Sequence, residues 1–325
     1  MLIDNVQINT TIVKRFSILN QKNRLAHAYL FSGPAYSGKS ETALAIAQLI
    51  NCENNEDGSL DNACQTCPAC KKTMAGNHPD VHFFQTEYGE TIKVETARAI
   101  LESIQLRPFE ARKKIFILRN AENLTLEGAN ALLKTLEEPS LNSLLILTTS
   151  QPEKILGTIR SRCHSVHFCS TSSETVKDQL EKLYDISSDD SHFLSYFAEG
   201  CLGKAKNLND MDFVQTKDEI LDNFVLTRDS EAFLKTILAD KTKTKILLDV
   251  LLSWTRDAIL LKSGFDEKQL IHANRLRDLN HFVAQYTFTD LKDINDEIVK
   301  ANKLLTDNLN IKVPLMIIKE KIWVS

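Results

Sequence analysis

The eight residues 33–40 carry a pattern that binds phosphate groups in many proteins. They read Gly-Pro-Ala-Tyr-Ser-Gly-Lys-Ser and match the template G-x-x-x-x-G-K-[ST] at every fixed position. Gly33 and Gly38 let the backbone bend so that several N–H groups point at one phosphate chain. Lys39 brings positive charge to the outer phosphates, while Ser40 offers a hydroxyl to Mg²⁺ and begins a helix whose N-terminus favours anions. The predicted nucleotide-binding residues are Gly33, Ser37, Gly38, Lys39 and Ser40.

The residues on either side of this loop supply the context that the template requires. Residues 28–31 form a short apolar run typical of a buried strand, and the apolar side chains of residues 41–50 recur at helical spacing. A chance match in a glycine-containing turn is the alternative, and the flanking strand and helix make it the weaker interpretation. The pattern predicts nucleotide binding and does not by itself indicate hydrolysis.

Four of the seven cysteines lie close together in the sequence. Cys52, Cys64, Cys67 and Cys70 have the spacing C-x₁₁-C-x₂-C-x₂-C, and four thiolates in this arrangement suit tetrahedral Zn²⁺. Because four sulfurs leave no open coordination position, the sequence predicts a structural zinc and not a catalytic one. His78 is a competing ligand, and free buried cysteines are the alternative to a metal site.

A site that hydrolyses nucleotide needs an acidic element as well as the phosphate-binding loop. In such sites an apolar strand ends in Asp-Glu, where the Asp holds Mg²⁺ and the Glu orients the attacking water. The candidate strand, residues 115–118, is followed instead by Arg119 and Asn120, and Glu122 lies two residues beyond the Glu position. A cation opposes Mg²⁺, and an amide takes no proton from water. We therefore expect a site that holds ATP or ADP but hydrolyses it poorly. The alternative is that the acidic strand lies elsewhere in the chain, with Asp80 as its carboxylate. Asp80, however, precedes the apolar residues of its segment, whereas the acidic residues of such a strand follow them.

Composition sets the broad class of the protein. The 325 residues, of which 43% are hydrophobic and 25% charged, indicate a soluble protein of two or three domains. No apolar run approaches the roughly 20 residues that span a bilayer. We expect no membrane association, and the first residues lack a secretion signal, so we expect a cytoplasmic protein. The net charge of −4 means that nucleic-acid contact requires a local basic face. One group of basic residues could form such a face: Arg107, Arg112, Lys113 and Lys114. The alternative is that they are solvated charges that flank a strand.

Strands that alternate with helices predict a doubly wound parallel sheet over residues 1–168, with the cysteine module at 52–70. Two further apolar segments, 115–118 and 144–149, are predicted buried strands of this sheet. After a small polar linker, residues 169–208 read as short helices. Residues 209–325 show only helical periodicity, which predicts a separate all-α domain.

Several longer segments resemble the bacterial clamp-loader branch of the AAA+ ATPases. They are residues 27–31 before the loop, the four-cysteine insertion, and the segments Asn-Ala-Leu-Leu-Lys-Thr-Leu-Glu-Glu-Pro (130–139), Leu-Thr-Thr (147–149) and Thr-Ile-Arg-Ser-Arg-Cys (158–163). The resemblance is detailed over about the first 205 residues. It implies an AAA+ domain, a helical lid at 169–208 and a helical collar at 209–325 that serves oligomerisation.

The resemblance also implies roles for individual residues. Motor subunits of the gamma/tau type keep Asp-Glu after their strand and delta-prime subunits have lost it, so Arg119 and Asn120 resemble the delta-prime type. Arg162 resembles an arginine finger that acts in trans on a neighbouring motor subunit, although a surface arginine is the alternative. Thr149, with Thr148 beside it, lies where a polar sensor of the γ-phosphate is expected, and a plain strand end is the alternative.

The implied partners are gamma/tau-type motor subunits and a delta subunit in a pentameric complex. Through that complex the chain is expected to act on the sliding clamp and on primer-template DNA. Two other functions stay open from the residues alone. One is an active motor ATPase of the same branch, and the other is a nucleotide-gated scaffold outside replication.

Overall fold

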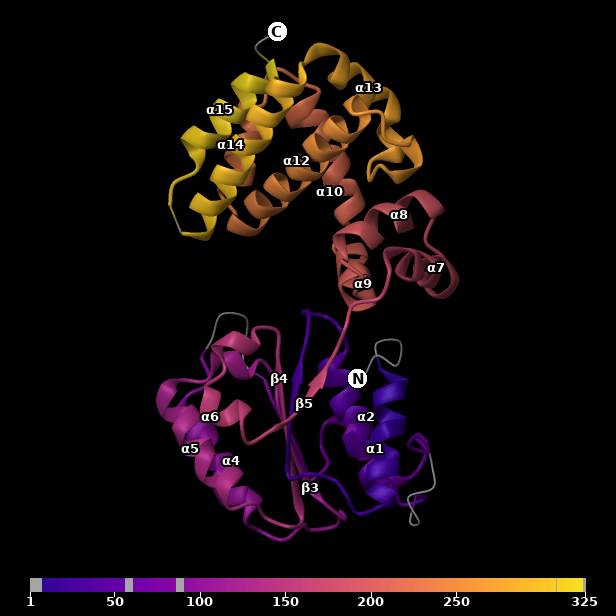
Figure 1. Cartoon of the computed structure of the whole chain (residues 1–325), viewed down its shortest axis with the longest axis vertical. Coiled ribbons are helices and arrows are strands. Elements are labelled where there is room, and N and C mark those ends of the chain that lie inside the picture. Colours follow the sequence, from indigo (N-terminus) through magenta and orange to yellow (C-terminus); the bar gives the residue numbers. More distant parts are fainter. Residues whose placement is uncertain (1–7, 56–60, 86–90, 308, 324–325) are drawn as a thin grey trace. The chain divides into compact units, whose positions relative to one another are not determined.

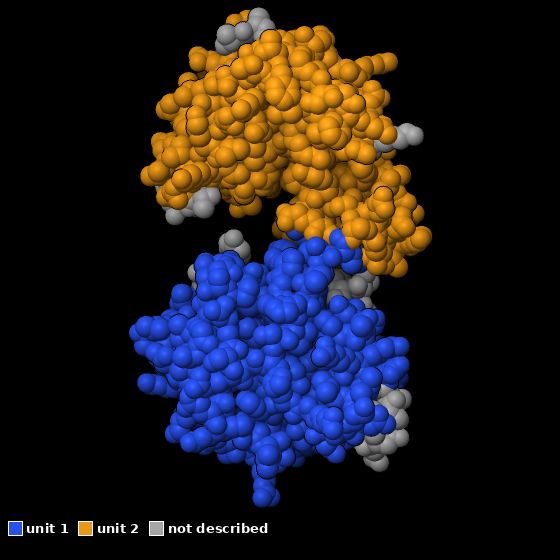
Figure 2. Space-filling view, in the orientation of Figure 1, with its two compact units in different colours: residues 1–171, 201–204 blue, residues 172–200, 205–325 orange. Residues whose placement is uncertain are grey.

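The computed structural model describes residues 8–55, 61–85, 91–307 and 309–323. The apolar spacing within residues 1–27 predicts a helical lead-in, and its residues 1–7 lie outside the described residues. Residues 56–60, between the first and second clustered cysteines, lie outside them too. The chain forms two compact units, which Figure 2 distinguishes by colour. The first unit comprises residues 1–171 and 201–204, and the second comprises residues 172–200 and 205–325. Each unit is described by itself.

The first unit is built on a five-stranded parallel sheet with the strand order β2-β3-β4-β1-β5. The strands are β1 (Ala28–Ser32), β2 (Val81–Phe84), β3 (Lys114–Leu118), β4 (Ser143–Thr149) and β5 (His164–His167). All residues of β1, β3 and β4 are buried, as expected for inner strands covered on both faces. The structure thus confirms the predicted parallel sheet. The sequence gives no signal for β5, because its residues His-Ser-Val-His form no apolar run.

Helices cover both faces of this sheet. Helices α1 and α2 lie on one face, and α4, α5 and α6 lie on the other (Figure 1). Two apolar cores result, because successive side chains of each strand point to opposite faces. The helical elements of the unit are α1 (Thr10–Gln21), α2 (Lys39–Asn51), α3 (Pro68–Ala75), α4 (Val94–Ile104), η2 (Ala121–Asn123), α5 (Leu126–Glu137), η3 (Pro152–Lys154) and α6 (Gly157–Arg160).

The strand order decides which loops meet. Strand β4 lies between β1 and β3, with Ser32 opposite Thr149 and Leu118 opposite Leu147. Parallel strands end at the same edge of a sheet, so the loops that follow β1, β3 and β4 converge there. These are the phosphate-binding loop, the segment that begins with Arg119, and the segment that begins with Ser150.

All regular elements described in the second unit are helical, which confirms the predicted all-helical C-terminal region. Helix α12 packs against α13 and α14, with Trp254 fully buried. None of the described helices in the chain is long and apolar enough to span a membrane. The helices after residue 172 are α7 (Ser173–Tyr184), α8 (Ser188–Phe197), α9 (Leu202–Asp210), α10 (Phe213–Ile220), η4 (Leu221–Val225), α11 (Glu231–Leu238), α12 (Lys241–Lys262), η5 (Glu267–Gln269), η6 (Ala273–Arg275), α13 (Leu276–Gln285), α14 (Phe288–Thr306) and α15 (Lys312–Trp323).

Candidate nucleotide-binding site

The loop at residues 33–40 has the geometry that its sequence predicts. Gly38 has φ of 78° and caps α2, whose first two residues are Lys39 and Ser40. A left-handed residue here is best supplied by glycine, which has no Cβ to clash. The N-terminal end of α2 therefore opens directly onto the loop, and its free N–H groups favour an anion.

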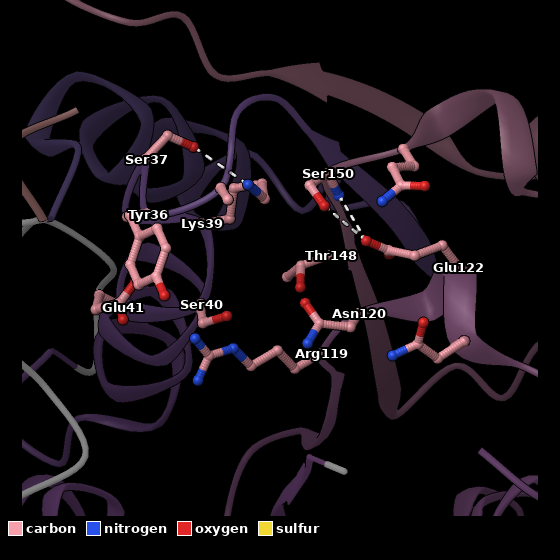
Figure 3. Close-up of a pocket in the computed structure, with 14 residues that line it drawn as sticks. Tyr36, Ser37, Lys39, Ser40, Glu41, Arg119, Asn120, Glu122, Thr148 and Ser150 are labelled. Carbon is pink, nitrogen blue, oxygen red and sulfur yellow. Dashed lines mark hydrogen bonds between the residues drawn. The ribbon is translucent and has the colours of Figure 1, made fainter. Parts of the chain in front are cut away.

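Lys39 lies inside the loop and not in solvent, with only 8% of its surface exposed. Its ammonium donates to the carbonyl oxygens of Gly33, at 2.9 Å, and of Pro34, and to the Ser37 hydroxyl at 3.3 Å (Figure 3). Burial lowers the pKa of Lys39 to about 8, and the negative charge of Glu122 opposes this shift. A phosphate at this position would replace weak carbonyl partners with a full negative charge.

A cavity of about 420 Å³ opens beside the loop. Small-molecule sites range over roughly 300–1,000 Å³, so it has the size of a ligand site. The loops after β1, β3 and β4 all line it, as the sheet order requires. The lining residues are Ala35, Tyr36, Ser37, Gly38, Lys39, Ser40, Glu41, Arg119, Asn120, Glu122, Asn123, Thr148, Ser150 and Gln151.

Arg119 and Asn120 both line this cavity, at the strand end where a hydrolytic site carries Asp-Glu. The Arg119 side chain points from the end of β3 towards Ser40 on α2 (Figure 3), and its Nη1 donates to Gln85 Oε1 at 3.0 Å. A guanidinium aimed at the hydroxyl that would ligate Mg²⁺ does not fit a divalent-cation site, because like charges repel strongly where water is partly excluded.

Asp80 does not supply the missing carboxylate. It precedes β2 and therefore lies at the opposite edge of the sheet, fully buried. Its oxygens accept from the backbone N–H groups of Phe109, Glu110 and Ala111 at 2.8–3.0 Å. These bonds make Asp80 the anchor of the loop before β3, which argues against the rival acidic strand.

Glu122 is a cavity residue whose place the sequence pattern alone does not reveal. Its carboxylate lines the cavity and accepts from the backbone N–H of Ser150 at 3.1 Å and from the Ser150 hydroxyl at 2.7 Å. Burial raises the pKa of Glu122, but hydrogen bonds from its own backbone and from Ser150 and Thr149 outweigh burial and lower it. The short helix η2, which begins after Asn120 with its φ of 54°, turns Glu122 towards the cavity. The number of residues between β3 and Glu122 does not by itself predict this turn.

The two threonines at the end of β4 have different surroundings. Thr148 lines the cavity, whereas Thr149 is not among its lining residues and is fully buried. The Thr149 hydroxyl accepts from the backbone N–H of Gln151 at 3.0 Å. Neighbouring strand residues point to opposite faces, which explains why only one of the pair faces the cavity.

Arg162 lies just after α6, away from the residues that line this cavity. Its Nη2 pairs with Glu137 Oε1 at 2.9 Å, and its Nη1 donates to the Thr158 carbonyl at 3.1 Å. The side chain is 37% exposed. These contacts, with a further one from Nη1 to the Ser161 hydroxyl at 3.5 Å, orient a guanidinium whose remaining surface faces solvent.

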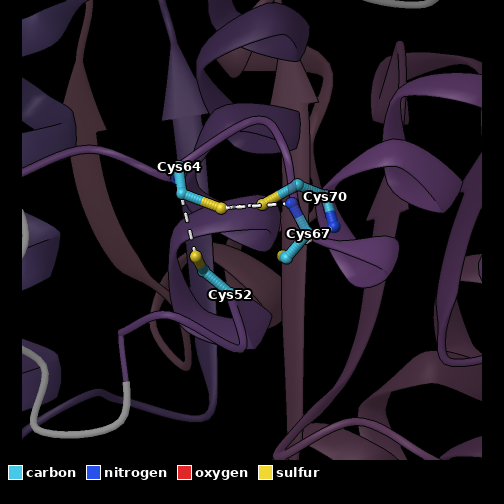
Figure 4. Close-up of side chains that lie close together, drawn as sticks. All are labelled: Cys52, Cys64, Cys67 and Cys70. Carbon is cyan, nitrogen blue, oxygen red and sulfur yellow. Dashed lines mark hydrogen bonds between the residues drawn. The ribbon is translucent and has the colours of Figure 1, made fainter.

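The four clustered cysteines come together in space (Figure 4). The sulfurs of Cys52, Cys64, Cys67 and Cys70 all lie within 4.8 Å of one another. Tetrahedral zinc with Zn–S bonds of 2.3 Å places sulfurs about 3.8 Å apart, so small adjustments would complete such a site. The cluster can hold a metal ion, and zinc as its identity stays a prediction.

Backbone donors support these sulfurs. The N–H of Cys64 points at Cys52 Sγ, that of Cys67 at Cys64 Sγ and that of Cys70 at Cys67 Sγ, with distances of 3.3–3.5 Å. Hydrogen bonds from Thr66 and from the Cys67 backbone lower the pKa of Cys64 to about 5, while burial raises the pKa of Cys70. Such N–H···S contacts stabilise thiolates, the form that binds metal.

His78, the competing ligand, is not part of this group of four. Its Nδ1 accepts from the Asp80 backbone N–H at 3.1 Å, and its Nε2 lies 3.8 Å from Glu110 Oε1.

The basic group before β3 is largely tied into the fold. Lys113 donates to the carbonyl of Leu141 at 3.0 Å, Lys114 is buried and donates to that of Ser103, and Arg112 donates to that of Asn55. These bonds favour a structural role for three of the four cations. Contact with DNA stays a prediction for the group.

Two family models match the chain. One, described as "DNA polymerase III, delta subunit", matches residues 8–172 and so spans half of the chain. The chain belongs to the DNA polymerase III delta subunit family. A second model, "DNA polymerase III, delta subunit, C terminal", matches residues 211–320. This family member is a clamp-loader subunit of DNA polymerase III with an α/β domain built on a parallel sheet and an all-helical C-terminal region.

The sequences of two individual relatives agree with this assignment. The chain is 29% identical to DNA polymerase III subunit delta' of Bacillus subtilis over 300 residues, which cover 90% of this chain and 89% of that protein. It is 34% identical to subunit tau of the same organism over 164 residues, which cover 50% of this chain and 28% of tau. Among solved structures, a gamma subunit-related protein from Thermotoga maritima aligns over 94% of this chain and 98% of its own, with 17% identity and a TM-score of 0.42.

Proposed function

We propose that this clamp-loader subunit is of the delta-prime type, binds nucleotide without efficient hydrolysis, and assists ATP hydrolysis in a neighbouring subunit. The observation that carries the proposal is the end of β3, where Arg119 and Asn120 line the cavity. The Arg119 cation opposes Mg²⁺, and the Asn120 amide cannot accept a proton from an attacking water. The intact loop, with buried Lys39 and the free end of α2, supports binding of ATP or ADP.

The share of each chain that the matches to relatives cover supports the delta-prime type. The match to subunit delta' runs over nearly the whole of both chains, whereas the match to tau covers half of this chain and less than a third of tau. We therefore place this chain beside gamma/tau-type motor subunits and a delta subunit in a pentameric complex. That complex would load the sliding clamp onto primer-template DNA. The helices from residue 209 onward would form its collar, and residues 169–208 the lid.

Arg162 is the residue that we assign to catalysis in trans. It lies outside its own cavity and is partly exposed, so it is accessible to the nucleotide of a neighbouring subunit. A guanidinium spreads charge over the γ-phosphate oxygens as negative charge develops on them. Supplied by a neighbour, it makes hydrolysis depend on correct assembly.

The test is a reconstituted clamp loader that contains the wild-type chain or Arg162→Ala. DNA-stimulated ATP hydrolysis should fall, while size-exclusion chromatography shows an unchanged complex. Arg160→Ala is the matched control, because Arg160 is an exposed arginine two residues away on α6. Equal hydrolysis by the wild-type and Arg162→Ala complexes would refute the role in trans.

Glu122 favours a second candidate function, that of an active motor ATPase. Its carboxylate lines the cavity and influences the charge of Lys39, so it is placed to interact with an attacking water. Steady-state turnover by the isolated chain distinguishes the two candidates. Turnover that both Lys39→Ala and Glu122→Gln abolish would establish the motor, and a chain that binds ATP without turnover would exclude it.

A further inference from the structure

The cavity holds a positive side chain at the position that a metal ion occupies in hydrolytic sites of this template. Ser40 carries the hydroxyl that ligates Mg²⁺ in the template, and the partner ligand comes from the end of the acidic strand. Here that strand end supplies Arg119, whose side chain lines the cavity and points towards Ser40 (Figure 3). The positive charge of Arg119 is close enough to Lys39 to disfavour its protonation.

The carboxylates of the cavity do not restore a metal site at this place. Glu122 is on the Ser150 side, where its hydrogen bonds hold it (Figure 3). Glu41 follows Ser40 on α2, and neither carboxylate stands at the end of β3. The side chain that stands there is a permanent cation, because a guanidinium keeps its proton at all working pH values.

We infer that Arg119 replaces the divalent cation, so that this chain binds ATP or ADP without needing Mg²⁺. This inference rests on the proposed nucleotide binding. Two cations, Lys39 and Arg119, face a polyphosphate from two sides of the cavity. Arg119 offers planar N–H donors that pair with two phosphate oxygens at once, as Mg²⁺ would bridge them. Its hydrogen bond to the neutral amide of Gln85 costs little to exchange for a phosphate.

The experiment is a calorimetric titration of the isolated full-length chain with ADP and with ATP, in excess Mg²⁺ and again with EDTA. The wild-type Kd should change by less than about twofold between the two conditions, whereas loss of a charge-assisted pair in Arg119→Ala should weaken binding in EDTA about tenfold or more. Arg119→Asp should bind nucleotide only when Mg²⁺ is present. The control is Arg98→Ala, an exposed arginine on α4 that does not line the cavity.

Each outcome has a definite meaning. Wild-type binding that EDTA weakens tenfold, or an Arg119→Ala variant with unchanged affinity in EDTA, would overturn the inference. A chain that binds no nucleotide in either condition would overturn it too. None of these results bears on Arg162, because its role is measured in the assembled complex on a neighbour's nucleotide. Circular dichroism of each variant checks that the fold is retained.

Discussion

Gly33 lies directly against the backbone of Phe168, the residue that follows β5. A Cβ on Gly33 would sit 2.3 Å from the Phe168 carbonyl oxygen and 2.9 Å from its Cβ. The contact is held in place because the Phe168 N–H donates to the Ser32 carbonyl at 2.7 Å. The first glycine of the phosphate-binding loop is therefore required by the edge strand beside it, in addition to the loop's own bend.

Replacement of this glycine should destabilise the chain even without nucleotide. Gly33→Ala forces backbone to move and also strains a residue with φ of 150°, so we expect a loss of roughly 2–4 kcal/mol in the free energy of unfolding. Urea denaturation measures it. Gly157→Ala is the control, since a Cβ there meets nothing within 4 Å, and its effect should stay within about 1 kcal/mol. Equal losses in the two variants would contradict the packing argument.

The cysteine cluster should bind zinc only when all four thiols are present. Cys70→Ser should lose most of the bound metal, measured by atomic absorption on freshly purified protein. Its melting temperature should fall by at least about 2–4 °C, since metal binding contributes to folding. Cys169→Ser, at an exposed cysteine outside the cluster, should keep both metal and stability. Wild-type protein without zinc, its thiols freely titratable, would remove the metal site.

The buried ammonium of Lys39 should make stability depend on pH at alkaline values. The pKa of Lys39 is about 8 in the fold, because burial disfavours its charge, and 10.5 in the unfolded chain. Between these two pH values the unfolded chain binds more protons than the folded chain, so the free energy of unfolding rises with pH. The cost of burying the charge is fully present below about pH 8. Across the window the wild-type chain should gain roughly 3 kcal/mol relative to Lys39→Met. Urea denaturation of both chains at several pH values tests this, and a difference that is constant with pH would contradict it.

Thr148 and Thr149 should respond differently to removal of the hydroxyl. Thr148→Val takes a polar group from the cavity and should weaken nucleotide binding by up to about tenfold in calorimetry. Thr149→Val leaves the Gln151 N–H without its acceptor, so the main effect should be a loss of about 1–3 kcal/mol in the free energy of unfolding. The reverse pattern would show that Thr149 is the residue that senses the phosphate.

Glu137 should restrain Arg162 without being needed for its action. Their ion pair is exposed, so Glu137→Gln should change the free energy of unfolding by less than about 1 kcal/mol. Because the variant removes a competitor for the guanidinium, hydrolysis by the reconstituted loader should hold steady or rise. The neighbouring Glu138→Gln is the control. A drop as large as that of Arg162→Ala would mean that the two residues act as one unit.

Much of the fold and of the candidate site was predictable because the signals are local in the chain. Continuous apolar runs predict the buried strands β1, β3 and β4, because helices cover both faces of the sheet. The phosphate-binding loop occupies eight consecutive residues, and three of the four cysteines lie within a single turn and the start of α3. Such patterns can be recognised without knowing which residues distant in the sequence contact them.

The tertiary structure decided what depends on neighbours distant in sequence. That β4 lies between β1 and β3 determines that Arg119 faces Ser40, and the alternation of side chains along β4 determines that Thr148 and not Thr149 lines the cavity. The turn at η2 brings Glu122 to Ser150. The sequence by itself determined that the chain carries a phosphate-binding loop without an acidic strand end. Only packing, which brings together the loops after β1, β3 and β4, determined which charges surround that loop.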